Sequence, residues 1–205
     1  MRDPAPGSPM AIAAYAWVDA LDEGAPDVVA AWRGIEEGRF TSVRREVRER
    51  AGAGTTERTV AQLATLADAL SEIVNRIPDD LLAAPGGEAD WNVAEATGHV
   101  ADARAGMSLA AAKAAAGLWP ADARPVVPGI PGPPGADRLA LMKRIAQSQR
   151  IVERAGRTVA GHESDPCPLE HPLVGRLRCG EWMLFAGVHD LMHLEQLHDL
   201  VAAAR

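Results

Sequence analysis

Three histidines in this chain have the residue type and the spacing to hold one metal ion. His189 and His193 lie four residues apart in the segment HDLMHLEQ near the C-terminus, and His99 closes the earlier segment WNVAEATGH. On a helix, residues four apart share one face and lie one turn apart, so both imidazoles can reach the same ion. With His99 from a second helix, the three would form an open site that leaves a position for water or substrate.

A purely structural interpretation competes with this one. A lone buried histidine is usually a core residue that is hydrogen-bonded to a carbonyl group. For the pair His189 and His193 both interpretations stay open, because two neutral imidazoles in an apolar core need separate partners unless one ion satisfies both. Gln196, three residues after His193, could support the site or form a bond between helices.

The elements that must position these histidines are four helices. Apolar residues at helical spacing and alanine-rich runs predict them at about residues 59–77, 92–117, 136–159 and 180–203. Asn92 is suited to be the N-cap of the second helix, and Glu95 can close a capping box with it. Long loops at residues 118–135 and 160–179 separate the later helices. We therefore predict an all-α fold, a four-helix bundle that occupies residues 58–205.

Residues 1–57 are predicted to be an N-terminal helical extension that ends in a linker. Residues 10–21 and 26–37 have the composition of two short helices. Residues 44–56 are charged and then rich in glycine and threonine, which is typical of a linker. The segment has too few apolar residues for an independent domain, so we expect it to pack against the bundle.

Angular positions on an ideal helix place the histidine pair in the core. At 100° per residue, His189, His193 and Gln196 fall within about 60° of one another, on the stripe that also carries Trp182. His198 falls on the opposite side of the helix and is predicted to face solvent.

Three carboxylates lie near the histidines in the sequence. Glu95 and Asp102 flank His99 on its helix, among small alanine and glycine residues that leave room beside the ring, and Asp190 directly follows His189. These carboxylates are candidates for orienting a ring or for transferring a proton. Each also has an ordinary explanation, since acidic side chains are mostly solvated and the capping box alone accounts for Glu95.

Charge and composition argue against several classes of protein. The 205 residues carry a net charge of −7 without a basic face, so we expect no binding to nucleic acid. No apolar run reaches the roughly 20 residues that span a bilayer, and the first residues lack the apolar segment of a secretory signal. Cys167 and Cys179 are too few for a disulfide scaffold. We therefore expect a cytoplasmic protein with reduced thiols and no membrane partner.

The loop at residues 160–179 offers a weaker alternative site. Cys167, His171 and Cys179, with His162, could bind a separate zinc ion, but their irregular spacing matches no recognised zinc pattern.

Two segments resemble the signatures of the DinB-like, or YfiT-like, superfamily of four-helix bundles. Residues 90–102 read DWNVAEATGHVAD, which is similar to the opening of that family's metal-site helix. Residues 171–197 read HPLVGRLRCGEWMLFAGVHDLMHLEQL, which is similar to its His-Pro-x-x-Gly loop and the following helix that ends in His-x3-His-x2-Gln. The resemblance covers about residues 59–205. It implies an up-and-down bundle with a long crossover, and metal ligands at His99, His189 and His193.

The resemblance also implies a divalent ion, often zinc or nickel, and a homodimer. Three neutral imidazoles leave the ion its full charge, so the pKa of a bound water or thiol falls toward or below neutrality. Relatives of this type include thiol-dependent transferases, so we expect a metal-dependent thiol S-transferase or a hydrolase that acts on a small-molecule substrate. The transferase would use a low-molecular-weight thiol as cosubstrate. The alternative is a non-catalytic bundle that the metal stabilises, acting as a stress-related binding or scaffold protein.

Overall fold

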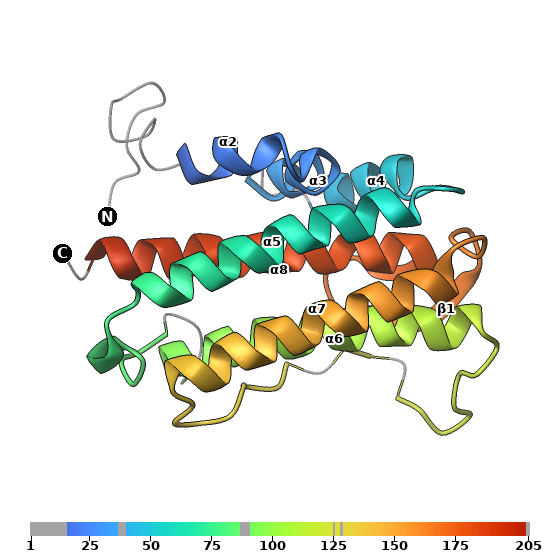
Figure 1. Cartoon of the computed structure of the whole chain (residues 1–205). Helices are drawn as coiled ribbons and strands as arrows, with labels where there is room; N and C mark the ends of the chain where they lie inside the picture. The colour runs from blue at the N-terminus through green and yellow to red at the C-terminus, as the bar shows by residue number, and fades with distance from the viewer. Residues whose placement is uncertain (1–15, 37–39, 87–90, 125, 128, 204–205) are drawn as a thin grey trace.

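A computed structural model describes residues 16–36, 40–86, 91–124, 126–127 and 129–203. Its centre is a bundle of four long helices: α5 Thr56–Arg76, α6 Val93–Ala115, α7 Arg138–Val159 and α8 Cys179–Ala203 (Figure 1). Both α5 and α6 pack against α7 and against α8, so α5 and α6 lie diagonally across the bundle. The prediction of an all-α four-helix bundle is confirmed.

The helix boundaries follow from local signals. Asn92 is the N-cap of α6: its side chain accepts a hydrogen bond from the backbone N–H of Glu95 at 2.8 Å, and the Glu95 carboxylate accepts one from the N–H of Asn92 at 2.9 Å. This is the predicted capping box, which satisfies two of the N–H groups that a helix start leaves free. At the start of α7, Asp137 accepts from the N–H of Ala140 at 2.7 Å.

The segment 160–179 is not the irregular loop that was predicted. It contains an antiparallel hairpin of β1 Pro166–His171 and β2 Gly175–Arg178, with Gly175 at a φ of 67° in the turn. Cys167 and Leu169 are buried on β1 and Leu177 on β2, because alternate residues of a short strand point to the core. Each strand is too short for this alternation to stand out in the sequence.

The crossover between α6 and α7, residues 116–137, is fastened to both the hairpin and α6. The N–H of Val127 donates to the carbonyl of Glu170 on β1 at 3.0 Å. The N–H of Gly132 donates to the carbonyl of Glu95 on α6 at 2.9 Å. These bonds hold the crossover against β1 at Val127 and against the first turn of α6 at Gly132.

In the described part of the N-terminal region, three further helices precede the bundle: α2 Ala16–Asp22, α3 Pro26–Glu36 and α4 Phe40–Arg50. The first two agree with the predicted short helices, although residues 10–15 lie outside the described residues. The predicted linker at 44–56 is partly wrong, because α4 extends to Arg50. Val43 and Val47 lie one turn apart and are fully buried, which gives this charged segment one apolar face to pack.

The last helix of the bundle, α8, also packs against the N-terminal helices. It contacts α5 and α6 on one side and α3 and α4 on the other (Figure 1). Gly187 lets α3 approach closely, since a Cβ there would lie 2.9 Å from the methyl groups of Val28. The same packing overturns the prediction for His198, whose ring is half-buried and stacks on Trp17 with centroids 4.7 Å apart.

None of the described helices combines the length and the apolar character that a bilayer-spanning segment requires.

Candidate metal centre

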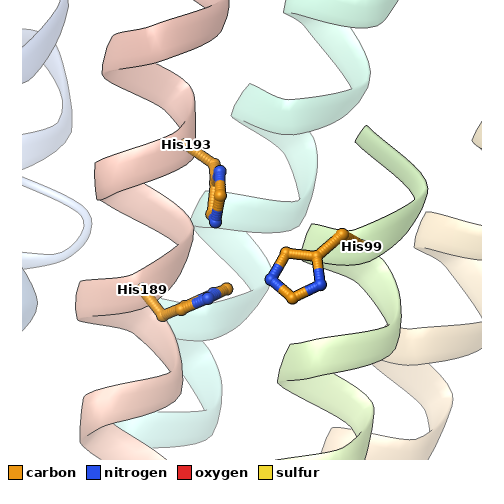
Figure 2. Close-up of side chains that lie close together, drawn as sticks. All are labelled: His99, His189 and His193. Carbon is orange, nitrogen blue, oxygen red and sulfur yellow. The ribbon is translucent and has the colours of Figure 1, made fainter. Parts of the chain in front are cut away.

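The structure brings the three histidines together in the interior of the bundle. His99 projects from α6, and His189 and His193 project from successive turns of α8 (Figure 2). The ring centroid of His99 lies 5.2 Å from the ring centroids of His189 and His193, and those two centroids are 4.6 Å apart. One ring nitrogen from each residue lies within 4.8 Å of the others. This is the spacing of donors that could share one ion.

His99 is held by the crossover between α6 and α7. Its Nδ1 lies 2.7 Å from the backbone carbonyl oxygen of Ile130. Because a carbonyl only accepts, Nδ1 carries the proton and donates it, so Nε2 keeps its lone pair for a metal. Trp91 packs on the same ring with centroids 4.8 Å apart. The ring is thus fixed in both tautomer and orientation.

His193 is held in the same way by Gln196. Its Nδ1 lies 2.8 Å from Oε1 of Gln196, and the amide nitrogen of Gln196 donates to the carbonyl of Gly86. The second bond sets which way the amide faces, so Oε1 must accept from His193 and Nε2 of His193 is left with its lone pair. Gln196 therefore both supports the ring and connects α8 to the segment before α6.

His189 differs from the other two. Its Nδ1 is buried and has no hydrogen-bond partner among the described residues. Burial, and then the proximity of His193, His99 and His171, holds the pKa of His189 well below its usual value. The ring is therefore neutral near pH 7 and offers a lone pair rather than a charge. A buried nitrogen without a partner fits a site that is completed by an ion.

The candidate carboxylates have other partners. Glu95 closes the capping box of α6, as described above. Asp102 is exposed and makes two bonds to Arg144 of α7, at 2.7 and 3.0 Å. This carboxylate raises the pKa of Arg144. The hydrogen bonds of both residues thus serve local structure, although Asp102 also lines a cavity together with His99.

Asp190 belongs to a fully buried ion pair. Its Oδ2 lies 3.1 Å from Nε of Arg104, and neither side chain is exposed. Arg104 also donates to the carbonyl of Leu63 on α5 at 2.7 Å and to Gln149 on α7 at 3.1 Å. Burial raises the pKa of Asp190 to about 7, against the opposing effect of Arg104. This pair connects all four helices one residue away from His189.

The alternative loop site does not assemble. Within the described residues, a metal-sized cluster of ligands forms at the three histidines of α6 and α8 and not at Cys167, His171 and Cys179. Both cysteines are buried and free. The ring of His171 instead packs edge-on against Phe185, with centroids 5.0 Å apart, and its Nδ1 accepts a hydrogen bond from the N–H of Leu173 at 3.2 Å. His162 bonds to Asp165.

Sequence reasoning missed two groups that position His99. The carbonyl of Ile130 comes from a loop whose path has no sequence signature, and the contact of Trp91 with the ring of His99 is a tilted packing of two aromatic rings that the sequence does not display. Gly98 is the one residue in the sequence that could have indicated the close approach of the crossover. A Cβ at Gly98 would lie 2.9 Å from Cδ of Pro133 and 3.0 Å from Cα of Gly132, so the residue next to His99 must be small for the crossover to approach.

The residues present fit a divalent ion. The donors are three imidazole nitrogens, two of them with their proton fixed on the far side of the ring, and nitrogen ligands of this kind suit zinc, nickel, copper and iron. Three neutral donors add no negative charge, so an ion here would keep its full charge at the open position. Such a centre can polarise a bound water, thiol or carbonyl group.

Comparison with known protein families gives one match. A sequence model of the DinB superfamily matches residues 62–197, a range that includes all three histidines. Among curated proteins and among solved structures, nothing matches.

Proposed function

The chain belongs to the DinB superfamily, and from this premise we propose that it is a divalent-metal-dependent enzyme that activates a small thiol or water for attack on a small-molecule substrate. His99, His189 and His193 would hold the ion. The observation that carries this proposal is the convergence of three imidazoles whose donor atoms lie within 4.8 Å of one another.

The chain's own groups prepare the site for this chemistry. A bound ion would supply a positive charge that lowers the pKa of a thiol or water. The carbonyl of Ile130 and the amide of Gln196 each bind Nδ1 of one ring, so His99 and His193 would both offer Nε2 to the ion. His189 is kept neutral by burial. The histidines are therefore oriented before an ion binds, and ordering them would take little of the binding free energy.

The finer features of the proposal rest on the family resemblance and on general chemistry. We propose zinc or nickel as the metal, a low-molecular-weight thiol as cosubstrate, and a homodimer as the assembly. Transfer of the thiol to an electrophile is preferred over hydrolysis. Glu95, Asp102 and Asp190 stay candidates for proton transfer, and Asp102 has the most suitable placement because it lines a cavity with His99. Residues 1–57 are proposed as an extension of the bundle domain at 58–205.

Elemental analysis of the purified protein tests the centre. We expect near-stoichiometric metal in the wild type and its loss in His99→Ala and in His193→Ala. His162→Ala is the matched control, since His162 is exposed and bonded to Asp165 outside the centre. Equal metal content in all four proteins would show that the three histidines are not its ligands.

A second measurement separates a catalyst from a structural clamp. The metal-loaded protein is mixed with 2-mercaptoethanol and 1-chloro-2,4-dinitrobenzene, or with 4-nitrophenyl acetate for hydrolysis, and the rate is compared with that of His193→Ala. Metal-dependent turnover supports the enzyme. Tightly bound metal without turnover, together with unfolding when a chelator is added, would favour the metal-stabilised scaffold instead.

A further inference from the structure

An apolar cavity lies beside His99. Its volume is about 210 Å³. Besides His99 and Asp102, its wall has four small or apolar residues from α6, namely Ala103, Gly106, Met107 and Ala110. Three more come from the crossover and β1: Val127, Ile130 and Leu169. His99 thus belongs to both the metal centre and the cavity.

We propose that this cavity binds a compact, uncharged, apolar group of the substrate, about the size of a phenyl ring, while the reacting atom of the same molecule reaches the three-histidine centre. This inference rests on the proposed function and adds the substrate class to it.

The hollow is produced by small residues on α6. Ala103, Gly106 and Ala110 lie three and four positions apart, so they share one face of the helix. A Cβ built at Gly106 meets no atom within 4 Å, so nothing fills the space that the missing side chain leaves. The opposite wall is apolar and includes Leu169 of β1, which is 7% exposed. Apolar walls around an unfilled space favour an apolar ligand.

The charges at the cavity are already satisfied, which argues against a charged ligand. Asp102 is neutralised by two bonds to Arg144. Nδ1 of His99 is committed to the carbonyl of Ile130. A ligand carboxylate or ammonium group would therefore lose its hydration without gaining a free partner among these groups.

The cavity is fixed before any ligand arrives. Its crossover wall is held at Val127 by the bond to Glu170, and at Ile130 by the bond to His99. Next to it, Gly132 donates to the carbonyl of Glu95. A preformed wall reduces the ordering cost of binding. Its volume also sets the size of the group, because an apolar cavity of about 150 Å³ in another protein binds benzene.

Two binding experiments with different requirements test this inference. The metal-free protein is titrated with 4-fluorobenzyl alcohol and followed by ¹⁹F NMR, which examines the cavity alone. The cobalt(II)-loaded protein is titrated with acetohydroxamate, phenylacetohydroxamate and succinic monohydroxamate, and followed by visible absorption. We expect 4-fluorobenzyl alcohol to bind, and the phenyl compound to bind about tenfold or more tightly than the acetyl compound, because it buries a phenyl group. Succinic monohydroxamate, which carries a carboxylate, should bind no more tightly than acetohydroxamate.

Filling the cavity should remove both effects. Gly106→Leu and Ala103→Leu each place a branched side chain into the space. Two variants are used so that the test still stands if one of them fails to fold. We expect them to lose binding of 4-fluorobenzyl alcohol and the preference for the phenyl compound, while keeping cobalt and acetohydroxamate affinity. Ala116→Leu is the matched control, since it enlarges an exposed residue at the end of the same helix outside the cavity.

The outcomes separate the two proposals. Normal cobalt binding without any phenyl preference, or a preference that survives in both filled variants, would overturn the cavity inference and leave the metal centre intact. Absence of cobalt, with 4-fluorobenzyl alcohol binding that both filled variants lose, would overturn the proposed function and leave the cavity as an apolar binding site.

Discussion

Each of the three imidazoles is fixed by a different kind of neighbour. His99 uses a backbone carbonyl from a distant loop, and His193 uses a glutamine one turn away on its own helix. His189 is held by burial, and its Nδ1 has no hydrogen-bond partner in the described part of the chain. The three histidines should therefore respond differently when their surroundings change, and this difference can be measured.

Gln196 is expected to act on metal affinity through His193. In Gln196→Leu the acceptor for Nδ1–H is lost and the ring is free to rotate, so affinity for zinc should fall by about 10- to 100-fold. In Gln196→Glu a carboxylate accepts the same proton, and affinity should stay close to that of the wild type. Competition with a chromophoric chelator measures both. Equal loss in the two variants would contradict a role through the hydrogen bond.

His189 should make the metal-free protein less stable in acid. Its folded pKa lies well below the usual 6.5, so below about pH 6.5 the unfolded chain binds a proton that the folded chain does not. The free energy of unfolding should therefore fall as the pH drops below that value, by up to about 1.4 kcal/mol per pH unit for this one group. The measurement is urea unfolding at pH 5 to 7.5 in the presence of a chelator.

The control for this pH dependence is His189→Leu. Asp190 acts in the opposite sense, because its folded pKa of about 7 keeps a proton that the unfolded chain loses above about pH 4. Comparing the slopes of the variant and the wild type removes that contribution. His189→Leu should show the smaller loss of stability on acidification, and identical slopes would mean that His189 takes up a proton as freely in the fold as outside it.

At the scale of elements, the sequence predicts what is decided locally. The capping box of Asn92 and Glu95, and the spacing of His189 and His193, depend on neighbours within four residues, and a single chain displays them directly. The carbonyl that orients His99 comes from Ile130, in a crossover whose path depends on β1 and on α6 together. No pattern within the loop contains that information.

Two elements, the hairpin and α4, were missed because other residues obscure their patterns. The hairpin at 166–178 shows its alternation over so few residues that three prolines and a glycine outweigh it. In α4, Val43 and Val47 indicate an apolar face, but four arginines and two glutamates lie around them within Arg44–Arg50. Such elements form because α8 and the bundle cover them, and that tertiary contribution is not visible in local composition.

Gly98 is predicted to control how α6 and the crossover meet. In Gly98→Ala the new methyl group would clash with Pro133 and Gly132, so the crossover must move and the bond from His99 to Ile130 should weaken. We expect a loss of stability of about 1–3 kcal/mol and weaker metal binding. Gly106→Ala is the control on the same helix, and with open space there it should gain about 0.5–1 kcal/mol. Thermal unfolding and chelator competition measure both effects.

Removing one member of the Arg104–Asp190 pair is predicted to destabilise the protein more than removing both. Arg104→Met leaves a buried carboxylate without its partner, and the free energy of unfolding should fall by about 3–5 kcal/mol. The double variant Arg104→Met/Asp190→Leu removes both charges and should recover most of this loss. Denaturant unfolding of the single and double variants gives the coupling. Simple additivity of the two losses would show that the buried charges do not depend on each other.

For the whole molecule, the position of α8 explains why the N-terminal helices matter to the centre. This helix carries two of the three histidines and is enclosed by α5 and α6 on one side and by α3 and α4 on the other. A helix that is apolar on nearly all sides needs cover on all sides. Helices α3 and α4 provide part of that cover, so α8 is held by elements outside the matched range of 62–197.

Gly187 is where this dependence can be tested, since it lies two residues before His189. In Gly187→Ala the added methyl group would lie 2.9 Å from Val28 of α3 and 3.0 Å from Leu63 of α5, so the variant should lose about 1–3 kcal/mol of stability even though alanine favours a helix. Val28→Ala removes one side of the clash, and the double variant should be more stable than the sum of the single effects, by about 0.5–3 kcal/mol. Denaturant unfolding measures this coupling, and zinc affinity should recover with it. If Val28→Ala gives no relief, α3 does not press on α8 in solution, and the N-terminal helices would have no influence on where His189 and His193 stand.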